Sequence, residues 1–159
     1  MPTLRPEDSY LQNAWKNSVY PLASRMDVEI RLPAVSPQPY TRLAFEGLEF
    51  AKDHGAGDEY NSGVMRAFFQ QSEDIGKPEV LTSVASAAGL DAKRFRNALE
   101  ERSYAERVGK LLRHAREEIQ VTGVPLFFIG DARLSGVQSR QTLEHIIEQQ
   151  LKHQQVGRR

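Results

Sequence analysis

The sequence of 159 residues contains no cysteine. Without cysteine the chain forms no disulfide, binds no metal through thiolates and carries out no thiol redox chemistry by itself. Long hydrophobic runs are missing as well. The longest apolar segment, Val124–Ile129, is far shorter than the roughly 20 residues that cross a membrane. We therefore expect no membrane span.

Two further signals are missing. No apolar signal core follows Met1, which predicts a cytoplasmic location. Neither sign of charge dominates, because 21 Lys and Arg balance 21 Asp and Glu. We therefore expect no nucleic-acid partner and no attraction to an anionic membrane. A hydrophobic content of 40% is typical of a folded globular protein, and the length predicts about one domain.

Residues 1–40 are expected to form an irregular, extended N-terminal segment. Within it, helical spacing over 10–24 predicts a short helix that ends at or soon after Pro21. Apolar residues then alternate from Met26 to Leu32, which indicates a short strand or an extended segment. Three prolines between positions 33 and 39 exclude regular structure there.

Residues 41–122 have helical periodicity and predict a helical domain. We expect helices at 41–54, 58–71 and 78–89, a short helix capped by Asp91, and a fifth that starts with the capping-box spacing Ser103-x-x-Glu106.

Residues 123–155 change pattern again. Pro125–Ile129 is a strand-length run that is apolar on both parities, as in a central strand covered on both faces. A turn at Gly130-Asp131, a return strand over 133–137 and a helix from Ser139 follow. The fold class is therefore an α-rich α+β fold.

Candidate acid–base and metal-binding residues give weak signals. The four histidines, His54, His114, His145 and His153, show no metal-ligand spacing, so we expect them to be solvated or to cap helices. The neighbouring acids, Asp53 with Asp58 and Glu73 with Asp74, are typical of turns and helix starts. The basic patches 93–96 and 113–116 are offset by adjacent glutamates. No metal site and no cofactor are expected.

One segment resembles a known family. Gly123-Val124-Pro125-Leu126-Phe127-Phe128-Ile129-Gly130, followed by Leu134-Ser135-Gly136-Val137-Gln138, resembles the cis-proline loop and closing hairpin of DsbA-like thioredoxin-fold proteins. The subgroup that it resembles best is the FrnE-type dithiol oxidoreductases with the related 2-hydroxychromene-2-carboxylate isomerases. Ala67-Phe68-Phe69-Gln70, Asp74-Ile75-Gly76 and Ala88-Gly89-Leu90-Asp91 resemble its helical insertion, and residues 4–7 resemble the segment after its second strand.

The resemblance implies a partial thioredoxin fold, in which the helical insertion 41–122 precedes a thioredoxin-fold remnant of strand, turn, strand and helix at 123–155. Family members carry Cys-x-x-Cys, or a serine in isomerase and kappa-class glutathione-transferase relatives, at a helix after the first strand. That unit has no counterpart here, so no catalytic residue carries over. What carries over is the loop Gly123, Val124 and Pro125, which in the family binds a peptide or glutathione, and a cis Val124–Pro125 bond.

Three functions remain open. The chain is a redox-inactive member of the DsbA/FrnE-like oxidoreductases, a non-enzymatic dimeric interaction module derived from that fold, or a glutathione-dependent isomerase or transferase relative. The resemblance favours a homodimer, because the strand that would pair with the edge of Leu126–Ile129 is missing and an apolar edge attracts another chain. Residues 3–5 or Met26–Leu32 provide an alternative partner strand within the chain, with Met26–Leu32 the better candidate.

Overall fold

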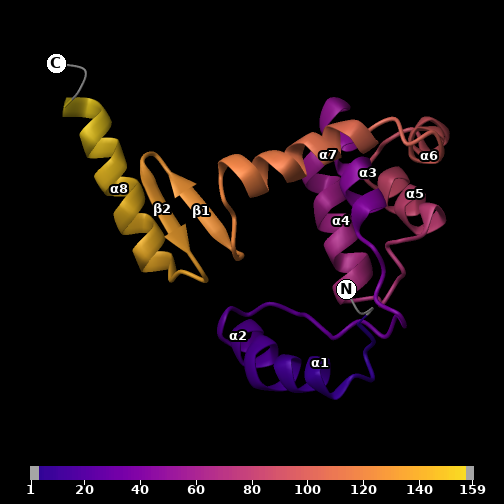
Figure 1. Cartoon of the computed structure of the whole chain (residues 1–159), viewed down its shortest axis with the longest axis horizontal. Coiled ribbons are helices and arrows are strands. Elements are labelled where there is room, and N and C mark those ends of the chain that lie inside the picture. Colours follow the sequence, from indigo (N-terminus) through magenta and orange to yellow (C-terminus); the bar gives the residue numbers. More distant parts are fainter. Residues whose placement is uncertain (1–3, 157–159) are drawn as a thin grey trace. The chain divides into compact units, whose positions relative to one another are not determined.

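The computed structural model describes residues 4–156 and divides the chain into two compact units, one up to Lys110 and one from Leu111 on. This division differs from the expected ranges 1–40, 41–122 and 123–155. Helices make up more than half of the chain, and one small sheet accompanies them (Figure 1). The α-rich α+β class is confirmed.

The N-terminal segment is more regular than we expected. Helices α1 (Ser9–Ala14) and α2 (Tyr20–Arg25) are joined without a break by a π-helical turn over Trp15–Val19. The helical stretch ends at Arg25, soon after Pro21, as expected. Pro21 itself lies in the first turn of α2, where a missing N–H is tolerated. Trp15 is buried, with its ring 5.5 Å from Tyr20 and 6.1 Å from Phe69.

Met26–Leu32 forms no strand: Met26 and Asp27 form a turn, with Asp27 at a φ of 52°, and residues 28–32 have no regular secondary structure. Its backbone forms hydrogen bonds with residues 69 and 70, at the end of the helix over 57–69. Arg31 N donates to Phe69 O at 2.8 Å, and the Gln70 side chain donates to Glu29 O at 3.0 Å. The segment therefore supplies no substitute strand, and Thr3 of the other candidate lies outside the described residues.

Four helices build the core of the first unit: α3 (Arg42–Asp53), α4 (Gly57–Phe69), α5 (Pro78–Ala87) and α6 (Ala92–Glu100). As predicted, Asp91 caps α6, and its Oδ1 accepts from Arg94 N at 2.9 Å. The next helix, α7 (Ala105–Arg113), begins two residues after Ser103. A second π-helical turn, His114–Glu118, continues α7.

The core is tightest where α3 meets α4. Tyr60 and Phe95 are almost fully buried there, with ring centroids 5.4 Å apart. A Cβ at Gly47 would overlap the Tyr60 hydroxyl and lie 2.7 Å from the Phe95 ring. Glycine at position 47 therefore permits this close approach.

The second unit holds an antiparallel hairpin of β1 (Leu126–Ile129) and β2 (Ala132–Ser135), followed by α8 (Arg140–Val156), which contacts β1 (Figure 1). Ser139 caps α8 through its hydroxyl, which accepts from Thr142 N at 3.0 Å. The sheet of the described residues has two strands. The expectation of a central strand covered on both faces is therefore wrong, and Phe128 is 56% exposed.

Candidate functional site

The loop before β1 presents its backbone to solvent. Gly123, Val124 and Pro125 are all exposed, Val124 by 85%. A Cβ at Gly123 would meet nothing within 4 Å. The Val124–Pro125 peptide bond is cis, in agreement with the expectation. The three predicted site residues thus form one exposed turn that leads directly into β1.

The register of the hairpin defines which backbone groups of β1 are free. Gly136 N donates to Pro125 O at 2.9 Å, and Phe127 pairs with Leu134. Hydrogen-bonded and non-hydrogen-bonded pairs alternate along an antiparallel ladder. The N–H and C=O groups of Leu126 and Phe128 therefore point away from β2. Among residues 4–156 no further strand pairs with this edge.

These two features form one surface. By the same alternation the N–H and C=O of Val124 continue the outward-facing groups of β1, which is the arrangement that binds an extended chain by strand addition. The Arg133 guanidinium lies 5.7 Å from the centroid of the Phe128 ring and adds a cation beside the apolar edge. We call residues 123–128 the edge site.

The histidines behave as expected of helix ends and solvated faces. His54 Nδ1 lies 2.8 Å from Phe50 O at the end of α3, and its ring stacks on Phe50 at 4.0 Å. His114 lies 2.8 Å from Glu118, one turn away. His145 contacts Gln149, also one turn away, and His153 is exposed. The described residues hold no cluster of three or more metal-ligating side chains.

Two buried carboxylates escaped the sequence reasoning. Glu46 is 1% exposed and accepts two hydrogen bonds from Arg102, at 2.9 and 2.7 Å. Glu49 is 4% exposed and lies 2.8 Å from Arg107 and 2.7 Å from Lys52. Each buried charge therefore has a cationic partner, as buried charges require. The pairs tie α3 to the start of α7, so their role is structural.

Asp53 is a third acid on the same face of α3 as Glu46 and Glu49. Its carboxylate accepts from Arg107 at 2.8 Å and from the Tyr104 hydroxyl at 3.0 Å. The hydrogen bond from Arg107 lowers the pKa of Asp53. The spacing 46, 49 and 53 places all three acids on one face of a helix, and this acidic stripe was the signal in the sequence that could have found them.

The family of this chain follows from a comparison with known protein families. A family model for the DsbA-like thioredoxin domain matches residues 11–148, so this protein is a member of the DsbA-like thioredoxin family.

Particular relatives are similar over different lengths. The uncharacterized protein YwbO of Bacillus subtilis is 43% identical over 152 residues, which are 95% of this chain and 76% of that protein. The Na(+)/H(+) antiporter NhaA 3 of Salinispora tropica is 31% identical over 105 residues, which are 66% of this chain and 15% of that protein.

A solved structure shares the fold. The crystal structure of a probable DsbA oxidoreductase from Streptomyces coelicolor superposes with a TM-score of 0.77 at 23% identity. The match covers 91% of this chain and 62% of that one, so our chain spans less than two thirds of the solved protein.

No helix among residues 4–156 is long and apolar enough to cross a membrane.

Proposed function

We propose that this chain is the substrate-binding part of a DsbA/FrnE-like thiol–disulfide oxidoreductase. In this proposal the edge site holds an extended peptide, and the chain performs no thiol–disulfide exchange by itself. The observation that carries the proposal is the exposed turn of Gly123, Val124 and Pro125, which continues into the edge of β1 that no other strand pairs with among residues 4–156.

The physical argument rests on backbone groups. A peptide laid along the edge of β1 would pair with the N–H and C=O of Leu126 and Phe128, and the loop would add those of Val124. Main-chain hydrogen bonds supply affinity without demanding a particular sequence, which suits a protein that acts on many unfolded substrates. Thiolate chemistry requires sulfur, and the sequence has no cysteine. We therefore place binding in this chain and electron transfer outside it.

The test separates binding from redox activity. The probe is the insulin B chain with its cysteines carboxymethylated, titrated into ¹⁵N-labelled protein. Val124→Pro removes the backbone N–H of the loop, whereas Val124→Ala keeps it and serves as the matched control. We expect amide shifts centred on 123–128. Val124→Pro should bind about fivefold more weakly, since one hydrogen bond contributes about 1 kcal/mol, and Val124→Ala should bind within about twofold of the wild type.

Equal binding by both variants, or shifts confined to residues outside the edge site, would refute the proposal. A dithiothreitol-driven insulin reduction assay covers the redox half. We expect the rate with this chain to equal the rate without protein, and a faster rate would contradict the assignment. The same titration with reduced glutathione addresses the isomerase or transferase alternative. Saturable shifts at the loop with glutathione but not with the peptide would favour that alternative.

A second candidate function is a homodimeric interaction module, in which the edge of β1 pairs with a second copy of the chain. The observation that favours it is the apolar edge itself, because Phe128 is 56% exposed and its backbone groups have no strand partner among residues 4–156. Two-fold symmetry satisfies an antiparallel edge with a copy of itself.

Light scattering coupled to size exclusion tests the dimer at micromolar concentration. Phe128 and Arg133 face each other across the hairpin, and by the alternation their free backbone groups lie on opposite edges. Phe128→Pro therefore blocks the β1 edge, while Arg133→Pro blocks the β2 edge and serves as the control. We expect a dimer that Phe128→Pro dissociates and Arg133→Pro retains. A wild-type monomer of 18.0 kDa would exclude this candidate.

A further inference from the structure

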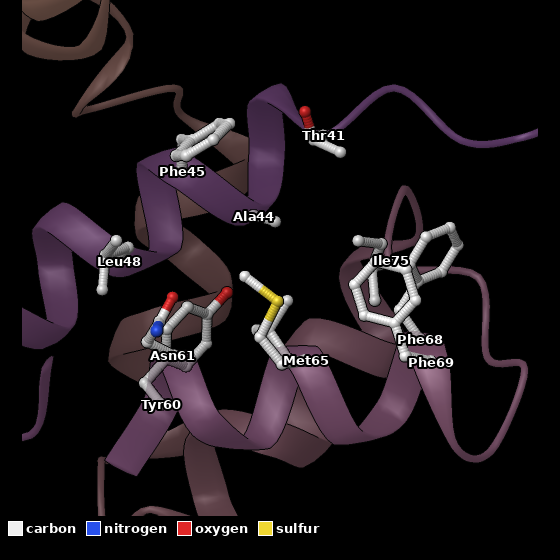
Figure 2. A pocket seen from close by; sticks show the side chains of 11 residues that line it. Thr41, Ala44, Phe45, Leu48, Tyr60, Asn61, Met65, Phe68, Phe69 and Ile75 are labelled. Carbon is white, nitrogen blue, oxygen red and sulfur yellow. The ribbon is translucent and has the colours of Figure 1, made fainter. Parts of the chain in front are cut away.

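Two apolar surfaces of the chain differ in charge. The groove between α3 and α4 is lined by uncharged side chains alone (Figure 2). The two strands of the hairpin, by contrast, contain one charged residue, Arg133. A cation beside an apolar edge distinguishes one peptide from another, because it attracts acidic side chains and repels basic ones. The hairpin therefore has a means of selection that the groove lacks.

Arg133 lies on the same face of the hairpin as Phe128. The two residues are directly opposed, and by the alternation of the ladder they form a non-hydrogen-bonded pair, in which the side chains approach closely. This face is the more open of the two. Phe128 is 56% exposed and Arg133 is exposed, whereas Phe127 and Leu134 on the opposite face are half-buried.

The Arg133 guanidinium is held in place but has no counter-charge. Its Nη2 donates to Gln120 O at 3.2 Å, and its Cζ lies 5.7 Å from the centroid of the Phe128 ring. Among residues 4–156 no carboxylate pairs with it. A side chain that is already positioned loses little conformational freedom when it binds an anion. Arg133 is therefore prepared to receive a carboxylate.

A peptide added to the edge of β1 brings one side chain next to Phe128 on this open face, because directly opposed residues of neighbouring strands share a face. Neighbouring strands lie about 4.8 Å apart, so that side chain starts about 10 Å from the backbone of Arg133, two strand spacings away. Arginine and glutamate side chains together span this separation and meet above the Phe128 ring between them. Guanidinium and carboxylate groups form charge-assisted hydrogen bonds.

We propose that Arg133 makes the edge site selective for extended peptides that carry an acidic side chain opposite Phe128. This inference rests on the proposed function and adds a preferred class of substrate to it. Main-chain hydrogen bonds along β1 hold the peptide, and Arg133 favours a carboxylate over a neutral or a basic group at that one position.

The test varies a single charge of the peptide. The host is a short peptide of threonine, valine and serine, blocked at both ends, with glutamate, glutamine or lysine at its centre. Each version is titrated into the ¹⁵N-labelled full chain at low salt. We expect the glutamate peptide to bind about threefold more tightly than the glutamine peptide, and the lysine peptide to bind most weakly. In about 1 M salt, where the Debye length is about 3 Å, the differences should vanish.

Two charge-removing variants locate the effect. Arg133→Gln removes the guanidinium and keeps a polar side chain. Arg140→Gln is the matched control, because it removes the same charge from the same unit at a residue of α8 whose side chain is 92% exposed. We expect the ratio of the glutamate and glutamine affinities to fall to about one in Arg133→Gln and to stay at about threefold in Arg140→Gln. Arg133→Lys keeps the charge and should keep a preference for glutamate.

The outcomes separate this inference from the proposed function. Amide shifts at 123–128 of equal affinity with all versions of the peptide would overturn the selectivity and leave the proposed function standing. Absence of such shifts with every version would overturn both. A preference that Arg133→Gln leaves unchanged, or that Arg140→Gln abolishes as well, would remove Arg133 from its assigned role.

Discussion

The pair Glu46–Arg102 offers the most direct test of how the first unit is held together. Arg102 donates two hydrogen bonds to a carboxylate that is 1% exposed. Arg102→Ala removes both donors and leaves Arg42, at 3.7 Å, as the remaining cation beside Glu46. The buried charge is then largely uncompensated.

The magnitude follows from burial. Removing one partner of a buried ion pair costs about 3–5 kcal/mol. Arg102 is itself 49% exposed on its side chain, and Arg42 together with entering water relieves part of the loss. We therefore expect Arg102→Ala to lower the free energy of unfolding by about 2–3 kcal/mol. Arg96→Ala is the matched control, because Arg96 pairs with the exposed Glu100 at 2.7 Å, and such surface pairs contribute less than about 1 kcal/mol.

A second variant separates the ion pair from the backbone. Arg102 has a φ of 57°, a left-handed conformation that disfavours side chains by about 1–2 kcal/mol. Arg102→Gly loses the pair but relieves the backbone, so it should be less destabilised than Arg102→Ala by about 0.5–1 kcal/mol, net of the greater freedom of glycine in the unfolded chain.

The assay is urea unfolding followed by the fluorescence of Trp15, the single tryptophan of the sequence, which is buried in the first unit. A loss from Arg102→Ala no greater than that from Arg96→Ala would refute the reasoning, because Glu46 would then have gained little from its partner. A glycine variant less stable than the alanine variant would refute the backbone argument alone.

Three further predictions concern the same unit and use urea unfolding. Gly47→Ala should destabilise by about 2 kcal/mol through overpacking against Phe95, and a neutral result would show that α3 and α4 move apart easily. Tyr60→Phe should stabilise by about 1 kcal/mol at pH 7, since it removes an unsatisfied hydroxyl. Burial raises the pKa of Tyr60 in the folded protein above its unfolded value of about 10. Wild type should therefore lose stability as the pH rises above about 10, whereas the variant has no ionisable group at this position and should lose less. Parallel pH profiles would contradict this. Asp53→Asn should destabilise at pH 7, because the hydrogen bond from Arg107 lowers the pKa of Asp53, and the difference from wild type should shrink as the pH falls through about 4; a constant difference would argue against it.

The helix positions were predictable because the apolar residues of this chain repeat with helical spacing and because characteristic residues mark where several helices start and end. Pro78 opens α5, Gly89 follows its end with a φ of 82°, and Asp91 caps α6. The loop 123–125 was predicted as a site from a resemblance, which a short and contiguous motif makes possible, and it stays a prediction.

The errors have physical causes. Glu46 and Glu49 were not recognised as buried. The helical spacing of the acids places them on one face of α3, but the burial of that face depends on arginines more than 50 residues away.

The arginine partners of α3 also constrain the order in which the first unit folds. Arg102 lies 56 residues after Glu46, so during synthesis α3 leaves the ribosome well before the cations that neutralise its inner face. Contacts of high sequence separation form late, after loop closure has been offset by other interactions. We therefore expect the helices from α3 to α6 to assemble while Glu46 and Glu49 have Arg42 and Lys52 of α3 as their cationic neighbours, and arrival of α7 to complete the fold. Substitutions in this network should accelerate unfolding more than they slow folding.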